Sequence, residues 1–454
     1  MANKNLLTYN AKVTQVEQDY FAPVASVSGS TIPVSTMYCF LSRVLPWTNE
    51  NQPATPNQDQ KSIKDIYKNI FVVKKVNASN ISPVIQRIDW ETGYVYDYYQ
   101  DDVDMFELDL NGFLIREFYV RNKYDQVFKC LWNNNGGVTS DEPFFQPGSY
   151  GTNNIFTGTD GYKWKFMYTI DVGRKTKFMD ITWMPVPVQK TAPDPNSGSA
   201  GWGDIEVINV VNTGSGYDPA NSTLSIVITG DGTGANATAQ VVNNEITDVL
   251  VVNQGSNYTY ANVSVVSALG SNATFIAPVS PIGGHGYDSV SELGCSRTMV
   301  TIEFNGSENG NIPIDIDYRQ VGLIVNPTAL STAPNPANGA IYKTTTDVVV
   351  APGFGIYGLD ETVYQGTSLE TATFSGTVLS FDEASNVIKL INTTGTRTLN
   401  APINGNSTQT SRTVLTVSTP DFVIYSGFLT YVENRSSVQR SVDGIEQFKF
   451  VLKY

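Results

Sequence analysis

Residues 161–171 read Gly-Tyr-Lys-Trp-Lys-Phe-Met-Tyr-Thr-Ile-Asp, so a large apolar side chain stands at every second position. Successive side chains of a β-strand point to opposite faces of the sheet, and aromatic rings favour such surfaces. The pattern predicts a strand of an antiparallel sheet whose aromatic face, from Tyr162 to Ile170, is packed. The opposite face, which carries Lys163 and Lys165, is predicted to lie in water.

The end of the chain repeats this alternation. Phe448, Phe450, Leu452 and Tyr454 alternate with mostly polar residues. A chain that ends in a strand usually has that end tied into a sheet. We therefore predict a mainly β, multi-domain fold, in which the N- and C-terminal parts of the chain form a β-sandwich core and small β modules are inserted.

The composition favours a β-rich structural protein. The chain has 454 residues, enough for about three domains. Only 16% of the residues are charged, and the formal net charge is −14. Nucleic acid binding needs clustered Lys and Arg, so this balance argues against a nucleic acid partner.

The cysteines and the apolar runs exclude further classes. Cys39, Cys130 and Cys295 lie far apart, which fits buried free thiols better than a disulfide framework or a zinc site. No apolar run approaches the roughly 20 residues that cross a bilayer. Residues 1–5 are not followed by a signal-type apolar core, so we expect synthesis in a cytoplasm and no membrane insertion.

One segment changes from the strand period to the helix period. Ile63, Ile66, Tyr67 and Ile70 form one stripe of a short amphipathic helix, which Asp59 or Ser62 could cap. Residues 6–50 are predicted to form strands and loops, with a buried strand at 36–43.

An internal repeat follows a predicted linker at 190–202. Residues 210–217, Val-Val-Asn-Thr-Gly-Ser-Gly-Tyr, return at 251–258 as Val-Val-Asn-Gln-Gly-Ser-Asn-Tyr. An alternating strand and a small-residue segment follow each copy. This pattern predicts an all-β module in which one supersecondary unit stacks on its copy.

Short strands punctuated by glycines then predict a small barrel. The predicted order is a first core part at 1–202, the repeat module at 203–280, a second core part with an extended loop at 281–360, the barrel at 361–420, and C-terminal core strands at 421–454.

The search for catalytic chemistry finds little. His285, the only histidine, could be a base or a metal ligand, but a structural hydrogen bond in its glycine-rich turn is the simpler expectation. The acidic cluster at 101–104 could bind a hard cation, although a solvated acidic turn fits better. Neither a nucleophile elbow nor a phosphate-binding loop is present. We therefore expect no catalytic residue, no cofactor and no bound metal.

Several stretches, taken together and in order, resemble one family. Residues 40–47 include Arg43, Pro46 and Trp47, and the later stretches are 63–70, 87–90, 128–131, 160–166, 318–327 and 426–450. They resemble the gene-product-eight baseplate wedge subunit of contractile-tailed bacteriophages. Gly-Gly-His-Gly at 283–286 is similar to the form of this subunit in phages of cyanobacteria. Residues 203–280 and 361–420 depart from the shorter members, and Asp443-Gly444 stands where the family tends to have Asp-Gln.

The resemblance implies a non-enzymatic structural subunit with a predominantly β fold. Such a subunit forms a homodimer within each wedge, contacts other wedge proteins, and carries force when the tail contracts. Its place is the tail baseplate of the virion, after assembly in the host cytoplasm. The candidate ion-paired or interface positions are Arg43, Trp47, Glu433, Asn434, Arg435 and Arg440. Glu433 and Arg435 could equally brace the terminal strand.

Two rival functions stay open. A tail-associated protein could bind host glycan through an aromatic groove on one of the inserted modules. A glycan hydrolase would need two carboxylates facing each other in a cleft, roughly 5 to 10 Å apart.

Overall fold

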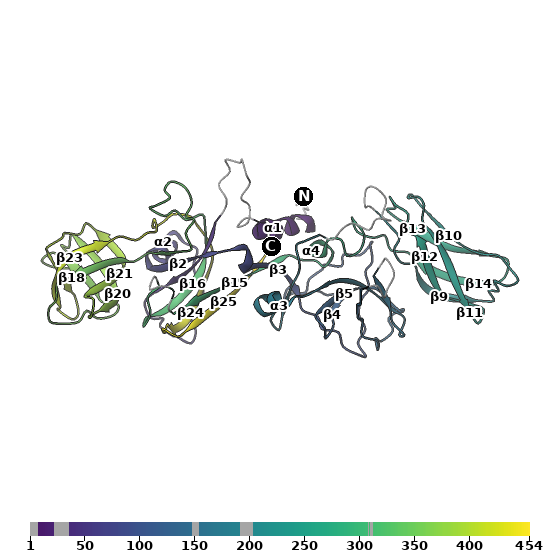
Figure 1. The fold of residues 1–454 in the computed structure, drawn as a ribbon, viewed down its shortest axis with the longest axis horizontal. Helices are drawn as coiled ribbons and strands as arrows, with labels where there is room; N and C mark the ends of the chain where they lie inside the picture. Colours follow the sequence, from purple (N-terminus) through teal and green to yellow (C-terminus); the bar gives the residue numbers. More distant parts are fainter. Residues whose placement is uncertain (1–7, 22–35, 148–153, 191–202, 307, 309–311) are drawn as a thin grey trace, which may run out of the picture. The chain divides into compact units, whose positions relative to one another are not determined.

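The computed structural model describes residues 8–21, 36–147, 154–190, 203–306, 308 and 312–454. Strands dominate these residues and form several sheets and a small barrel, so the predicted mainly β, multi-domain fold is confirmed (Figure 1). Residues 191–202 of the predicted linker lie outside the described residues.

The chain divides into two units by its internal contacts. The first contains Met1–Gln18, Ser82–Met299 and Val451–Tyr454, and the second contains Asp19–Ile81 and Val300–Phe450. The predicted repeat module therefore lies within the first unit and the predicted barrel within the second. The division falls inside three strands, β3 (Ile81–Gln86), β15 (Arg297–Asn305) and β25 (Ile445–Lys453).

The strand predicted at 162–170 belongs to a sheet of the first unit. The antiparallel order is β4 (Tyr119–Arg121), β5 (Gln126–Asn133), β7 (Tyr162–Thr169) and β6 (Ile155–Thr157). Trp164 on β7 is fully buried, and the rings of Tyr162 and Tyr96 have their centroids 5.5 and 5.7 Å from its own. The aromatic face is packed, as predicted, whereas the last strand, β25, belongs to a different sheet.

The prediction of a solvated opposite face is wrong. Lys163 and Lys165 are only 8% and 6% exposed. Residues of the inserted module cover this face, where the Nζ atoms of the two lysines lie 2.8 Å from Asp248 and 2.7 Å from Glu206. A polar strand face can be buried when each charge meets an opposite charge.

Helices of the first unit were missed by periodicity. The expectation of strands and loops at 6–50 is wrong for α1 (Tyr9–Phe21). Among residues 9–18 of this helix, Val13 and Val16 are buried in the core and Tyr9 packs against it. Asp171 accepts a hydrogen bond from the backbone N of Arg174 at 2.9 Å and so begins α3 (Val172–Phe178). The remaining elements of this unit outside the module are β3 (Ile81–Gln86), β8 (Trp183–Pro185) and α4 (Ser289–Glu292).

The inserted module has six strands that pair across the two repeat copies. The first copy supplies β9 (Asn209–Ser215), β10 (Leu224–Gly230) and β11 (Asn236–Val242), and the second supplies β12 (Glu245–Asn253), β13 (Ala261–Ser267) and β14 (Ser271–Ile276). The pairs are β9 with β14, β12 with β11, and β10 with β13. The copies are therefore interleaved, rather than stacked as separate units.

The two copies build the same local structure. Asn212 and Asn253 each accept a hydrogen bond from the glycine N two residues on, at 2.9 and 3.0 Å. Tyr217 and Tyr258 are buried, and their hydroxyls accept hydrogen bonds from backbone N–H groups at 3.2 and 3.4 Å. The sequence repeat is thus a structural repeat.

The second unit contains a five-stranded antiparallel sheet. Its order is β17 (Ile341–Lys343), β2 (Ile70–Val76), β1 (Met37–Ser42), β16 (Asp317–Val325) and β24 (Phe428–Gln439). Early and late segments of the chain therefore flank β16. The predicted helix is α2 (Gln60–Asn69); Asp59 caps it and Tyr67 packs against the core beside the sheet.

The second unit also contains the predicted barrel. It closes in the order β18 (Thr346–Val350), β21 (Val387–Gly395), β20 (Phe374–Asp382), β19 (Thr362–Gln365), β22 (Pro402–Gly405) and β23 (Ser411–Ser418). Its first strand lies in the segment predicted as an extended loop, because Val348 and Val350 alternate into the barrel core.

The structure also bears on the predictions about the cysteines and about membrane-spanning segments. Cys39, Cys130 and Cys295 are buried free thiols, as predicted. Within the described ranges, none of the helices combines the length and the apolarity needed to cross a bilayer.

Candidate functional site

Arg43 stands at the end of β1 and is almost fully buried. Its Nε and Nη2 atoms each donate a hydrogen bond of 2.8 Å to the carboxylate of Asp360. Nη1 donates to the backbone oxygen of Asp317 at 3.1 Å and forms an ion pair with the carboxylate of that residue. A guanidinium suits such two-pronged contacts because its donors lie in one plane.

This contact extends into a chain of alternating charges. Asp317 also pairs with Arg319, whose Nε lies 2.9 Å from Oε1 of Glu50. Partial desolvation would raise the pKa of Glu50, but hydrogen bonds from Arg319 and from the backbone of Ser437 and Trp47 lower it. The series Asp360, Arg43, Asp317, Arg319 and Glu50 is called the charge chain below.

Trp47 and Asn434 hold the segment 47–54 beside β24. The indole Nε1 of Trp47 donates to the backbone oxygen of Arg435 at 2.7 Å, and Nδ2 of Asn434 donates to that of Ala54 at 2.6 Å. Glu50 accepts a hydrogen bond from the backbone N of Ser437 at 3.1 Å. Because β24 is an edge strand of its sheet, this segment covers part of an edge that could otherwise pair with another chain.

Glu433 and Arg435 brace the sheet from the same strand. Nε of Arg435 lies 2.8 Å from Oε1 of Glu433, and the guanidinium stacks over the ring of Phe448 at 5.1 Å from its centroid. Asn434, between them, accepts a hydrogen bond from Gln320 on β16 at 2.7 Å. Of the two alternatives for Glu433 and Arg435, these contacts favour bracing.

Arg440 lies elsewhere, between β24 and β25. Its side chain is fully buried and donates to the backbone oxygen of Pro313 at 2.7 Å. Its Nη2 also lies 3.1 Å from Oε2 of Glu446. The structure therefore brings five of the six candidate residues together, and Arg440 braces a separate turn.

A groove of about 630 Å³ opens beside the charge chain. Residues 43–48 form one wall, Asp65 and Asn69 of α2 contribute a second, and the barrel contributes a third with Asp360, Thr362, Thr377, Ile391 and Asn392. Leu45 is 69% exposed here. Because Arg43 is already bound to two carboxylates and Asp65 adds a negative charge to the lining, the groove is not an anion site.

The buried charges of the first unit form a second cluster, which sequence reasoning missed apart from His285. Nζ of Lys129 on β5 lies 3.2 Å from Oε2 of Glu292, 3.0 Å from Nδ1 of His285, and 3.9 Å from the ring centroid of Tyr99. Beside them, Glu206 pairs with Lys165 and accepts a hydrogen bond from the backbone N of His285. These residues are called the buried network below.

Burial and neighbouring charges fix the protonation states of the buried network. Burial and the Lys129 charge lower the pKa of His285, so the ring is neutral at neutral pH. Burial alone would raise the pKa of Glu292, but Lys129, His285 and a backbone donor lower it to about 2. Burial likewise opposes ionisation of Glu206, whose pKa is nevertheless lowered, chiefly by Lys165.

The buried network suits bracing better than catalysis. The side chains of Lys129 and His285 have no exposed surface and that of Glu292 has almost none, so a substrate cannot reach them. Glu206 opens the inserted module and His285 follows it, so the network pins both ends of the module to β5 and β7. In the sequence, the lysines on the predicted strand were the one signal for this cluster. Their acidic partners lie far away in the sequence, and no local pattern identifies them.

The acidic cluster at 101–104 does not assemble a metal site. Oδ2 of Asp101 accepts a hydrogen bond from the backbone N of Val279 at 3.2 Å. Across the part of the chain that the structure describes, no group of three or more His, Cys, Asp or Glu side chains could hold a metal ion.

No protein-family model matches the sequence, and no curated protein is detectably similar to it.

Proposed function

We propose that this chain is a structural, non-catalytic subunit of a phage tail baseplate wedge. In this role it is a homodimer that connects other wedge proteins during baseplate assembly and tail contraction. It is made and assembled in the host cytoplasm and resides in the virion.

The observation that carries the proposal is where the family-like stretches lie. Residues 40–47, 318–327 and 426–450 are far apart in sequence, yet β1, β16 and β24 are hydrogen-bonded neighbours in one sheet. Residues 128–131 and 160–166 likewise meet on β5 and β7. Stretches that jointly build the two central sheets are the parts that a distant relative would retain.

The hydrogen bonds and ion pairs of these stretches also support a role in carrying force. Arg43 ties the end of β1 to Asp360 beside the barrel, and Trp47 ties its own segment to β24 through the backbone oxygen of Arg435. Multiply bonded, partly buried charges resist relative sliding of the elements that carry them, because separation leaves each charge unpaired.

Two measurements test the proposal. Light scattering of the purified chain across a concentration series should give a constant mass of twice that of the 454-residue chain. Antibodies against the chain should label the tail end of intact virions in electron micrographs. A monomer at every concentration, together with virions that are not labelled, would refute it.

A further inference from the structure

We infer that the groove between β13 and β14 of the inserted module is a binding site for an uncharged saccharide. The site is independent of the proposed wedge function and rests on three observations. They are a cavity in the module, the chemistry of its lining, and a break in the internal symmetry at that place.

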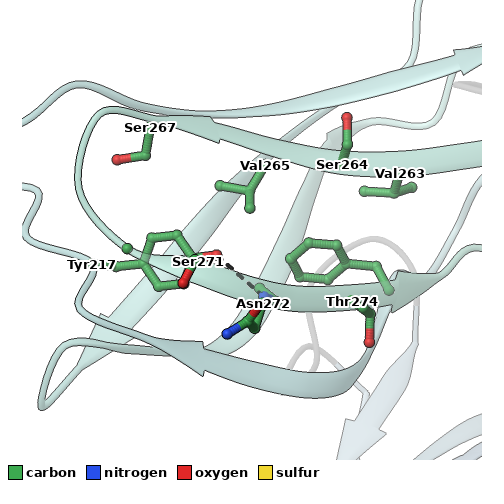
Figure 2. A pocket seen from close by; sticks show the side chains of 11 residues that line it. Tyr217, Val263, Ser264, Val265, Ser267, Ser271, Asn272 and Thr274 are labelled. Atoms are coloured by element: carbon green, nitrogen blue, oxygen red, sulfur yellow. Dashed lines mark hydrogen bonds between the residues drawn. The ribbon is translucent and has the colours of Figure 1, made fainter.

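The cavity has a volume of about 430 Å³, within the roughly 300–1,000 Å³ range of small-ligand pockets. Figure 2 shows Val263 and Val265 on β13 facing the space beside β14, with Tyr217 at the end next to the turn that joins the two strands. β13 is paired with β10 and β14 with β9, so the two strands are not hydrogen-bonded to each other where the groove opens.

The lining combines apolar and neutral polar groups. Phe275, Val263 and Val265 supply apolar surface, whereas Ser271, Asn272 and Ser267 supply hydroxyl and amide groups. None of the residues that line the cavity is charged. A sugar ring presents a C–H face that packs on aromatic and aliphatic carbon, and a rim of hydroxyls that need neutral donors and acceptors. An acidic or phosphorylated ligand would find no counter-charge here.

The internal repeat supplies a comparison within the same molecule. On the cavity side Val210 pairs with Phe275, and at the equivalent step of the other copy Val251 pairs with Ala237. Both pairings follow an irregularity at the same place, between Thr274 and Phe275 in one copy and between Asn236 and Ala237 in the other. In the same alignment Asn272 corresponds to Gly234.

The scaffold is therefore kept in both copies, while the lining differs. Each tyrosine of the repeat packs on a glycine, Tyr217 on Gly270 and Tyr258 on Gly232. One copy adopts this structure with small residues, Ala237 and Gly234, at the two positions. The cavity side thus carries an amide at Asn272 and an aromatic ring at Phe275 where the other copy has Gly234 and Ala237, and Phe275 also packs against the core of the module.

An extended peptide is the other ligand that an open strand edge could accept. The shape of the cavity favours a saccharide. An added strand would have to continue past the end of the cavity beside Gly270, and the ring of Tyr217 occupies that place.

The test uses saturation-transfer difference NMR with the full chain and three sets of probes. These are neutral hexose and N-acetylhexosamine mono- and disaccharides, sialylated or sulfated saccharides, and an uncharged extended hexapeptide. We expect signals from the neutral saccharides and weaker or no signals from the other two.

The decisive variant is Asn272→Gly with Phe275→Ala, which gives the cavity side the residues of the other copy. It should weaken saccharide binding about tenfold. Because Phe275 also packs against the core of the module, Asn272→Gly alone is measured beside it, and this single variant should keep the thermal unfolding midpoint close to wild type and still weaken binding. Asn236→Ala, on the other copy and outside the lining of the cavity, is the control and should leave binding unchanged.

Three outcomes would overturn the inference. They are no neutral saccharide signal at millimolar concentration, equal binding by the double variant, and binding of the hexapeptide alone. Each of them leaves the wedge proposal intact, because that proposal is tested by mass and virion location.

Discussion

Nζ of Lys165 and Oε2 of Glu206 lie 2.7 Å apart, and both side chains are almost entirely shielded from water. Lys165 belongs to the central strand β7, and Glu206 opens the inserted module. The pair therefore fixes the base of the module on the sheet. Removing one partner leaves the other charge buried without compensation, which is far costlier than the loss of an exposed pair.

Glu206→Gln should destabilise the first unit by about 3–5 kcal/mol. Hydrogen exchange of β5 and β7 peptides, followed by mass spectrometry, measures the effect where it occurs. Lys165→Met should act in the same direction, and the double variant Lys165→Met with Glu206→Leu should lose less than the sum of the two. Additive losses would contradict a coupled pair.

Lys163 and Asp248 provide the matched control on the same strand. Their Nζ and Oδ1 atoms lie 2.8 Å apart, but the aspartate is 35% exposed. The side chain of Lys163 is 10% exposed and keeps its hydrogen bond to the backbone oxygen of Ile208, so Asp248→Asn should cost about 1–3 kcal/mol, less than Glu206→Gln. Equal losses at the two pairs would show that burial does not decide their contribution.

Acidification should weaken the buried network. The pKa of Glu292 is about 2 in the folded protein and 4.5 ordinarily, so its stabilisation is present above pH 4.5 and is lost as the pH falls toward 2. This difference corresponds to about 3 kcal/mol. His285, whose folded pKa is also lowered, adds a loss that begins below pH 6.5, because protonation favours the unfolded chain.

The Glu292→Gln variant isolates this contribution from the other carboxylates. It should be less stable than wild type at pH 7, and the difference between the two proteins should shrink as the pH falls from 4.5 toward 2. Lys129, Lys165, Glu206 and Tyr99 face the same network and stay unchanged in this comparison. A constant difference across that range, measured by urea unfolding, would contradict the assignment.

Sequence patterns predicted local structure well and distant partners poorly. The alternation around Trp164 located β7, and Asp59 marked the start of α2, because these signals lie within a few residues. The face of Lys165 was misjudged, since its partner Glu206 lies 41 residues away. Trp47 and Arg435 were singled out separately, but their contact spans 388 positions, and no local rule joins them.

Arg43 should tolerate even a conservative change badly. Lysine cannot reproduce the two parallel hydrogen bonds to Asp360 and the contacts with Asp317, so Arg43→Lys should destabilise the second unit by about 1–3 kcal/mol. Lys123→Arg is a suitable control, because the side chain of Lys123 is 64% exposed beside Glu142. Urea unfolding that shifts equally in both variants would contradict a special role for the charge chain.

Trp47→Phe should loosen the segment that covers β24. The change keeps an aromatic ring but removes the indole donor to the backbone oxygen of Arg435, at an expected cost of about 1 kcal/mol. Amide protons of residues 434–437 should exchange faster, while those of β1 should not change. Uncovering an edge strand should also raise the tendency to aggregate, which light scattering on storage measures. Unchanged exchange at 434–437 would show that the segment does not protect the edge.

The internal symmetry of the module makes a final, quantitative prediction about two glycines. A Cβ at Gly270 would lie 2.4 Å from the ring of Tyr217, and one at Gly232 would lie 2.4 Å from the ring of Tyr258. Both alanine variants should therefore destabilise the module through a clash with the ring, by about 1–3 kcal/mol, and a Cβ at Gly232 would also lie 2.6 Å from the backbone oxygen of Ser256. Gly270 also has a φ of +92°, which an alanine adopts only with strain, so Gly270→Ala should be the more damaging variant.

Gly136→Ala separates the two causes, because Gly136 has a φ of +78° and open space around its Cβ position. Thermal unfolding of the three variants should rank Gly270→Ala as least stable, and a Gly136→Ala variant as unstable as Gly232→Ala would refute the clash with the tyrosine rings as the dominant cost.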